Sequence, residues 1–196
     1  MMGGETDNRQ SGFTLLEILI ALIILVIGTF AVVKLQMTSR SSNYDSMQRG
    51  IAGILVHDIT ERMRANNDAL ESYEATDLGS GSLGSEPSPG CTNSLDSCSG
   101  SQLAAHDLWE WEQLLDGASE LSAGGNSTGG LLKPTACIAG PGGGVSGTYT
   151  VAIAWRGKRA LSNPTSTTCG EGSGNYGASD EFRRVMVLDT YISTAN

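Results

Sequence analysis

Two histidine–aspartate pairs have residue types that could do chemistry. His57-Asp58 and His106-Asp107 resemble ligands of a metal-dependent phosphohydrolase, but a chain with 2 histidines has too few ligands for such a centre. The glycine-rich stretch 140–144 lacks the lysine and hydroxyl residue that follow in a phosphate-binding loop. The simpler interpretation puts His57 on a helix face and Asp107 at the start of a helix, where aspartate caps. We find no catalytic set and expect a protein that is not an enzyme and uses no metal or cofactor.

The cysteines offer two kinds of chemistry, disulfides or zinc binding. They are Cys91, Cys98, Cys137 and Cys169. None of them has the close spacing of zinc ligands, and neither histidine is near them, so zinc is disfavoured. Four cysteines allow three disulfide pairings. We favour Cys91 with Cys98, closing a small loop, and Cys137 with Cys169, tying a sheet to a long loop; the other pairings stay open.

One carboxylate stands inside an apolar run. Residues 13–33 read FTLLEILIALIILVIGTFAVV, and Glu17 is the only charged residue among them. About 20 such residues suffice for a helix to cross a bilayer. An acid in a spanning helix is costly and usually has a partner, although a glutamate near the interface can also reach water. We expect residues 13–34 to form a transmembrane helix and Glu17 to pair with a positive charge of a neighbouring subunit.

The residues around Glu17 carry a family resemblance. The motif GFTLLE at residues 12–17, followed by the apolar run, resembles the class III leader of type IV pilins and their relatives. The resemblance implies that residues 1–12 are a leader removed by a prepilin peptidase after Gly12. It also implies that Phe13 becomes the N-methylated amino terminus and that Glu17 docks the subunit into the filament. A Sec signal peptide is the alternative, and its best cleavage position, after Ala31, is poor.

Beyond the apolar run, the sequence predicts a continued helix. No proline precedes Pro87, and apolar residues recur at helical spacing. They are Tyr44, Met47, Ile51, Leu55, Ile59 and Met63. We expect this stripe to face a sheet, the amphipathic half of the helix to cover residues 35–67, and Asn66 to stop the helix.

Residues 68–196 are expected to form a periplasmic or extracellular globular domain. Apolar and polar residues alternate over 148–155, and a further apolar run covers 183–192, so both stretches predict strands. A third strand is expected within 131–138, a helix over 104–115, and a surface connection over 70–103. The expected fold class is α+β, with the long N-terminal helix packed on a small antiparallel sheet of three or four strands. The pilin resemblance implies the same fold.

The wider layout resembles one branch of the pilin family, the PilV minor pilins. The residues that carry this resemblance are the RMRAN stretch 62–66, a cysteine-flanked segment, Asp107, Trp111, Trp155 and the final strand start RRV at 183–185. The resemblance implies partners: other minor pilins, with which the chain forms an initiating tip complex, the major pilin, and an inner-membrane assembly platform. It also implies an inner-membrane protein with a cytoplasmic amino terminus, which later becomes part of an extracellular pilus.

Two other functions remain open. A pseudopilin of a type II secretion system shares the leader and the architecture, and a binding or adhesion module could occupy a filament tip. With 12 basic and 21 acidic residues, the net charge of −9 disfavours binding to nucleic acid. Arg156, Lys158 and Arg159 form one local basic cluster, which we interpret as a solvated loop.

Overall fold

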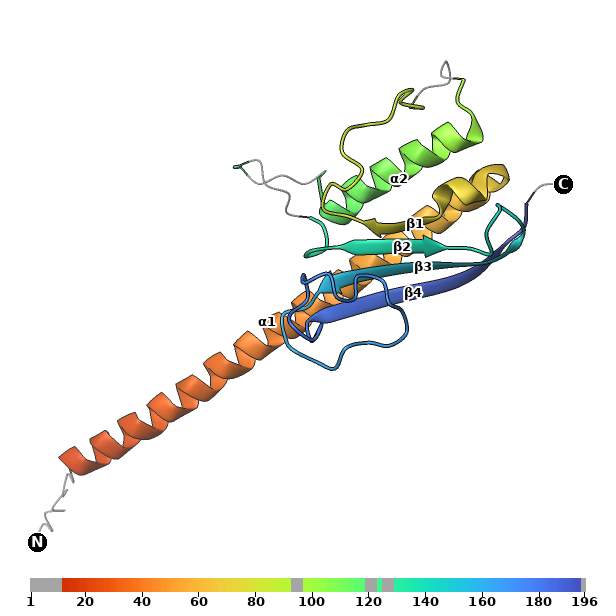
Figure 1. The fold of residues 1–196 in the computed structure, drawn as a ribbon. Coiled ribbons are helices and arrows are strands. Elements are labelled where there is room, and N and C mark those ends of the chain that lie inside the picture. The colour runs from red at the N-terminus through yellow and green to blue at the C-terminus, as the bar shows by residue number, and fades with distance from the viewer. Residues whose placement is uncertain (1–11, 93–96, 119–122, 125–128, 195–196) are drawn as a thin grey trace, which may run out of the picture. The chain divides into compact units, whose positions relative to one another are not determined.

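The computed structural model describes residues 12–92, 97–118, 123–124 and 129–194. Of the expected leader, residues 1–12, only Gly12 lies within these ranges. The chain divides after Asn43 into two compact units. Helix α1 (Leu15–Ala65) begins in the first unit and ends in the second (Figure 1). The remaining elements belong to the second unit and are η1 (Asn67–Tyr73), β1 (Ala75–Leu78), α2 (Gly100–Asp116), β2 (Thr135–Ala139), β3 (Gly147–Arg156) and β4 (Arg183–Ile192).

The described part of the first unit is an apolar helix with a short lead-in. Thr14 stands just before α1, and its Oγ1 accepts a hydrogen bond from the Glu17 N–H at 3.3 Å, as an N-cap residue does. An 18-residue window of α1 has a mean hydropathy of 2.9, and none of it is buried in the structure. By length and composition, this helix could cross a bilayer.

The second unit contains a four-stranded antiparallel sheet in the order β1-β2-β3-β4. Strands β3 and β4 pair without a break from Gly147 opposite Ile192 to Arg156 opposite Arg183. Strands that are adjacent in the sheet are also consecutive among the strands along the chain, with α2 between β1 and β2 and the 157–182 loop between β3 and β4. The α+β fold expected from the sequence is confirmed, with four strands.

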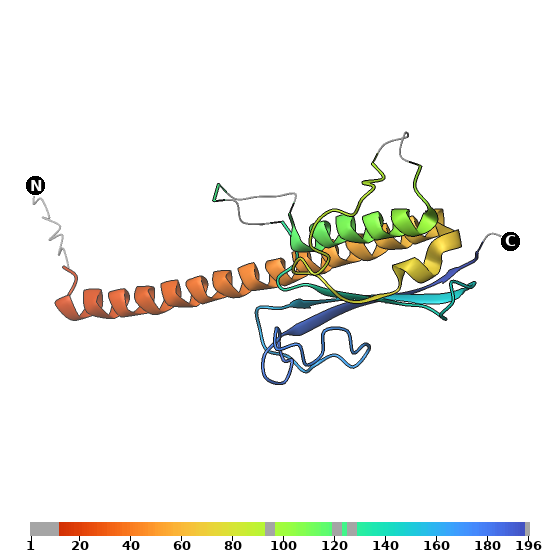
Figure 2. The same ribbon diagram turned by 45° about the horizontal axis from the view of Figure 1, so that its top comes forward.

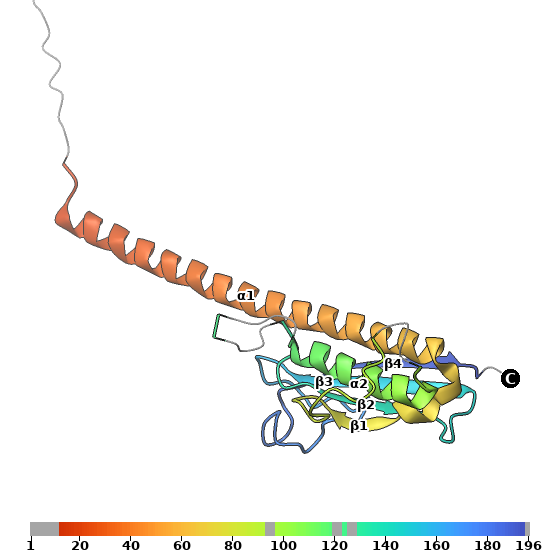
Figure 3. The ribbon, with the colours of Figure 1, turned by 90° about the horizontal axis from the view of Figure 1, so that it is seen from above.

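One face of the sheet is covered by helices and the other by a loop. Within the second unit, α1 and α2 cover one face of the sheet, while the 157–182 loop lies against the other (Figure 2). The two helices run side by side (Figure 3). The core between helices and sheet is made of large apolar side chains, among them Ile59, Met63, Trp111, Tyr149, Ile153 and Trp155.

Strand β3 is buried on both faces over its second half, where the sequence predicts a half-buried strand. Ala152 and Ala154, on the face away from the helices, are 2% and 0% exposed. The 157–182 loop covers them: the Tyr176 hydroxyl, which donates to Thr135 Oγ1 at 2.8 Å, lies 3.5 Å from the Ala154 carbonyl oxygen. A loop without regular structure thus completes the second layer.

The buried stripe of α1 differs from the expected one near its start. Met47 is 55% exposed, whereas Gln48 is 2% exposed. The Gln48 amide donates to the Gly130 carbonyl at 3.2 Å and accepts from the Leu132 N–H at 3.1 Å. A polar side chain is buried here because it pairs with backbone groups of the segment before β2, which periodicity cannot reveal.

The region expected as a surface connection contains regular structure. Residues 67–78 form η1 and β1, and β1 pairs with β2. Helix α2 starts at Gly100, four residues before the expected Ala104. Ser99 and Gln102 form a capping box there, a signal present in the sequence. Strand β2 begins only after Pro134, since proline cannot donate to the ladder.

Candidate functional site

The predicted processing site lies at the start of the first unit. Gly12, Phe13 and Thr14 precede the first helical residue, and Phe13 is 81% exposed. A Cβ built on Gly12 meets no atom within 4 Å, so no described residue requires glycine there by crowding. A requirement for glycine at residue 12 would therefore come from an enzyme that reads it.

Phe13 and Glu17 lie on the same side of the beginning of α1. Both line a shallow apolar groove with Ile18, Ala21, Leu22 and Leu25. The Glu17 side chain is exposed and accepts no hydrogen bond from any described residue. In a bilayer or a filament core, an ionised carboxylate in this position needs a cation from outside the chain. The geometry allows that pairing with a neighbour's amino group; cleavage, methylation and docking stay predictions.

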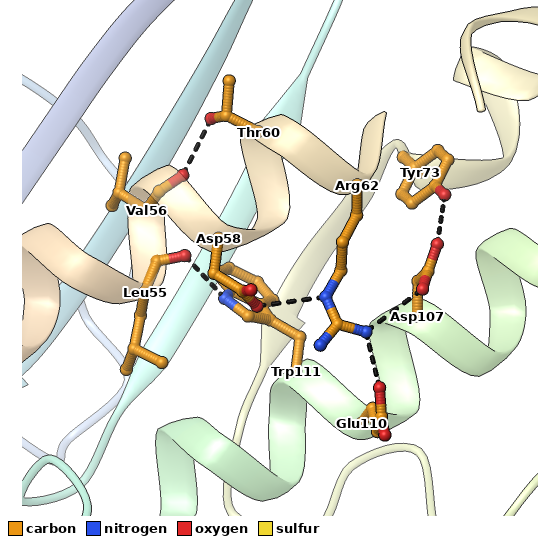
Figure 4. A network of polar contacts seen from close by, with 9 residues as sticks. All are labelled: Leu55, Val56, Asp58, Thr60, Arg62, Tyr73, Asp107, Glu110 and Trp111. Carbon is orange, nitrogen blue, oxygen red and sulfur yellow. Dashed lines mark hydrogen bonds and ion pairs between the residues drawn. The ribbon is translucent and has the colours of Figure 1, made fainter. Parts of the chain in front are cut away.

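Arg62 joins α1 to α2 in the second unit. Its guanidinium contacts three carboxylates: Asp58 at 3.0 Å, Asp107 at 3.1 Å and Glu110 at 2.6 Å (Figure 4). Burial lowers the pKa of Arg62, but the bonds to these carboxylates outweigh it, so the pKa lies above its ordinary value. The guanidinium remains charged and fixes the two helices at one register.

Asp107 lies inside α2, so the prediction that it starts a helix is wrong. The capping box at Ser99 starts α2 earlier, and Asp107 instead accepts a 2.5 Å hydrogen bond from the Tyr73 hydroxyl. Burial raises the pKa of Tyr73, and the bond to the Asp107 carboxylate raises it further. The Tyr73 hydroxyl therefore stays protonated and links η1 to α2 (Figure 4).

Trp111 completes the contact between the two helices. Its ring is fully buried, and its Nε1–H donates to the Leu55 carbonyl oxygen at 2.8 Å (Figure 4). A buried indole N–H without a partner would be costly, so this bond selects the position of α2 along α1. Arg62, Asp107 and Trp111, all part of the PilV-like pattern, thus meet in one helix–helix contact.

Glu112 and Asp116, one turn apart on α2, hold a loop by its backbone. Glu112 is fully buried and accepts hydrogen bonds from the N–H groups of Gly79, Ser82 and Leu83 at 2.7 to 2.9 Å. Asp116 accepts from Ser80 and Gly81 at 2.8 Å. Burial raises the pKa of Glu112. The hydrogen bonds from these N–H groups and from the Ser82 hydroxyl lower it by more, so the pKa lies below its ordinary value. The sequence analysis missed both residues.

The cysteines form two disulfides, Cys91–Cys98 and Cys137–Cys169. This is the pairing favoured from the sequence. The second disulfide fixes the 157–182 loop to β2, and the fully buried Arg183 holds the same loop from within. The Arg183 guanidinium donates to the carbonyls of Pro164, Thr167 and Cys169 and to the Asn163 side chain. The loop therefore has a defined conformation despite its glycines.

In the local basic cluster, Lys158 and Arg159 are exposed in the loop, as expected, whereas Arg156 ends β3 and is half-buried. The Arg156 guanidinium lies 4.6 Å from the centre of the Phe182 ring, and the Lys158 ammonium lies 3.9 Å from that of Tyr44. Both cations rest on aromatic faces, which favours packing over contact with phosphates. Among the described residues, no group of three or more histidines, cysteines or carboxylates could hold a metal ion.

Comparison with protein families gives two matches. Residues 7–33 match the prokaryotic N-terminal methylation motif, and residues 34–109 match the family described as type IV pilin Tt1218. The first range includes Gly12, Phe13 and Glu17. No curated protein and no solved structure was found to match the chain. The two family matches support a structural, non-catalytic protein of the pilin type, and the long helix with its antiparallel sheet agrees with the type IV pilin fold.

Proposed function

We propose that this pilin-type structural protein is a minor pilin of a type IV pilus, of the PilV kind. It assembles with other minor pilins into an initiating tip complex, on which the major pilin is then stacked. The observation that carries the proposal is the succession of two matches in one chain, the methylation motif through the apolar run and the pilin family from there into α2. The contact among Arg62, Asp107 and Trp111 gives the PilV-like pattern a common structural role.

The proposed maturation follows from the first unit. A prepilin peptidase cuts between Gly12 and Phe13, and the new amino terminus is methylated. Before assembly, the apolar part of α1 spans the inner membrane with the leader in the cytoplasm. The second unit is then periplasmic, where an oxidising environment favours both disulfides. The assembly platform moves the subunit into the pilus, where Glu17 pairs with the amino terminus of a neighbouring subunit.

The test is the amino-terminal residue of the protein in sheared filaments. Mass spectrometry of the first peptide is expected to give an N-methylated Phe13 and no residue from the 1–12 segment. A chain that begins at Met1, or at a residue after Ala31, would overturn the proposed maturation. Immunogold labelling restricted to filament ends would support the tip position, and uniform labelling along the filaments would contradict it.

A pseudopilin of a type II secretion system is the second candidate. The methylation motif match favours it as much as it favours a pilin, because both classes share that leader. Deletion of the coding sequence separates the two functions. If the protein is a minor pilin, its deletion is expected to abolish surface pili while secretion continues. If it is a pseudopilin, its deletion is expected to block secretion while pili remain.

A further inference from the structure

A polar groove lies on the face of the sheet that is turned away from the helices. It has a volume of about 420 Å³ and lies between the sheet and the tip of the 157–182 loop. Strand β1 contributes Thr76 and Asp77, and the loop contributes Glu171. Strand β3 contributes Thr150 and Ala152. The volume lies within the range of sites for small molecules or single side chains.

The lining carries negative charge and hydrogen-bond acceptors. Asp77 and Glu171 are its only ionisable side chains among the described residues, and no lysine, arginine or histidine lines it. Glu171 accepts one bond from Asn163 at 3.1 Å, and Asp77 accepts none from the described residues. One carboxylate comes from β1 and the other from the loop, both are exposed, and their spare lone pairs suit a guest that only donates.

The groove is rigid on its loop side. Cys137 and Cys169, which join the loop to β2, are both part of the lining. Gly170, also in the lining, has a φ of +72°, and a Cβ there would lie 3.3 Å from the Ala154 Cβ. Arg183 holds the loop carbonyls from the inside and is not part of the lining. A preformed wall lowers the entropy lost on binding.

We propose that this groove binds an arginine side chain presented by a partner protein. A guanidinium has five donors and no acceptor, and its planar fork matches the geometry of a carboxylate. A divalent ion fits less well, because the described residues offer no group of three or more charged ligands there. The inference rests on the proposed function only for the partner, a neighbouring subunit or a protein met at the filament tip.

The test uses residues 44–196, which form the second compact unit and hold the hydrophobic core of the described residues, so we expect them to fold without the first unit. The ¹⁵N-labelled domain is titrated with the peptide acetyl-Gly-Arg-Gly-amide and, separately, with the same peptide carrying citrulline. Citrulline has the shape of arginine without the charge. We expect shifts of the amide signals of Thr76, Thr150 and Thr168, and we expect the citrulline peptide to bind at least about fivefold more weakly than the arginine peptide.

Two variants locate the binding. The double variant D77N/E171Q is expected to weaken arginine binding about tenfold, at about three- to fivefold for each charge. The control D68N/E86Q removes the same charge from exposed positions outside the groove and is expected to bind as the original domain does. Asn tolerates the positive φ of Asp77, so the variant keeps its backbone.

The disulfides provide an independent arm. C137S/C169S frees the loop wall and is expected to abolish binding, while C91S/C98S leaves it unchanged. If C137S/C169S does not fold, D77N/E171Q decides. The proposal would be overturned if the citrulline peptide bound as well as the arginine peptide, or if folded D77N/E171Q kept the original affinity. It would also be overturned if calcium or maltose bound more tightly than the arginine peptide at the amides of Thr76, Thr150 and Thr168. None of these outcomes depends on pilus assembly, so the proposed function is tested separately by the mature amino terminus.

Discussion

The carboxylate of Glu112 accepts a hydrogen bond from the backbone N–H of Gly79 at 2.8 Å, across 33 residues of sequence. The same buried carboxylate accepts the N–H groups of Ser82 and Leu83. A single α2 side chain thus supplies acceptors for a loop that has no ladder of its own. The contact depends on the negative charge of Glu112, so we expect the domain to lose stability when acid protonates this carboxylate.

Glu112→Gln is expected to lower the free energy of unfolding of residues 44–196 by about 1–3 kcal/mol at pH 7. The glutamine side chain keeps one acceptor oxygen but turns an N–H toward donors. Because the pKa of Glu112 is lowered in the folded state, its stabilisation is complete at neutral pH and is lost as pH falls through that lowered value. Urea unfolding at pH 7 and pH 3 should therefore show a smaller difference between variant and original at pH 3. Glu86→Gln is the control, and an equal difference at both pH values would contradict the mechanism.

Arg62→Met is expected to cost about 1–2 kcal/mol, because Asp107 and Glu110 lose their cation at a half-buried helix contact. Arg64→Met is the matched control on the same turn. Among the residues that the structure describes, Arg64 pairs with the exposed Glu61 alone and bonds to Thr190, so its loss should cost less than about 0.5 kcal/mol. Thermal and urea unfolding of the two variants measure the difference, and equal stabilities would refute the role given to Arg62.

Gly170→Ala should destabilise the domain more than Gly172→Ala. Both glycines have a φ close to +70°, so alanine is strained by about 1–2 kcal/mol at either position. At Gly170 the new Cβ would also lie 2.9 Å from the Tyr176 ring, while at Gly172 it meets nothing within 4 Å. The crowding adds about 1–3 kcal/mol at Gly170. Urea unfolding compares the two, and a Gly172 variant that is as unstable as the Gly170 variant would show that crowding is unimportant.

Gly12→Ala is expected to leave an unprocessed chain in the membrane fraction. The substitution removes no contact within the described residues, so the second unit should fold normally. Immunoblotting of membrane fractions measures the size of the chain, and thiol labelling of the denatured protein reports whether both disulfides have formed. A mature-sized product from this variant would exclude the proposed peptidase site.

Glu17→Ala is expected to be processed as usual and to reach filaments at least tenfold less, because the neighbour's amino terminus loses its counter-ion in an apolar setting. Ile18→Ala is the control, since it shortens an adjacent side chain without changing charge. Quantitative immunoblots of sheared pili and of membranes separate processing from assembly. Normal piliation in a strain with Glu17→Ala would rule out the docking role.

Local patterns in the sequence predicted much of the fold. Strand β3 was found from its alternating apolar residues, β4 from a further apolar run, and the apolar part of α1 from its length. Strand β1 was missed because its four residues, ATDL at 75–78, have no pattern of their own. It exists through its pairing with β2. The earlier start of α2 could have been found from Ser99 and Gln102.

Polar contacts in the second unit were harder to predict. Glu112 and Arg183 are fully buried, although charged side chains usually face water. Their partners are mainly backbone groups of distant loops, which no side-chain pattern encodes. Asp107 was assigned to a helix start because aspartate often caps helices, and its actual partners, Tyr73 and Arg62, come near it only in the folded domain.

The sequence alone determined the apolar segment with its single acid, the leader-like motif at Gly12 and Phe13, and the presence of a helix followed by strands. These features depend on neighbours in the chain, so composition and spacing encode them. The tertiary structure decided how α2 lies on α1, how Cys169 and Arg183 fix the long loop, and where the acidic groove forms. Those features arise from contacts between residues 14 or more positions apart, and only chain folding brings such residues within hydrogen-bonding distance.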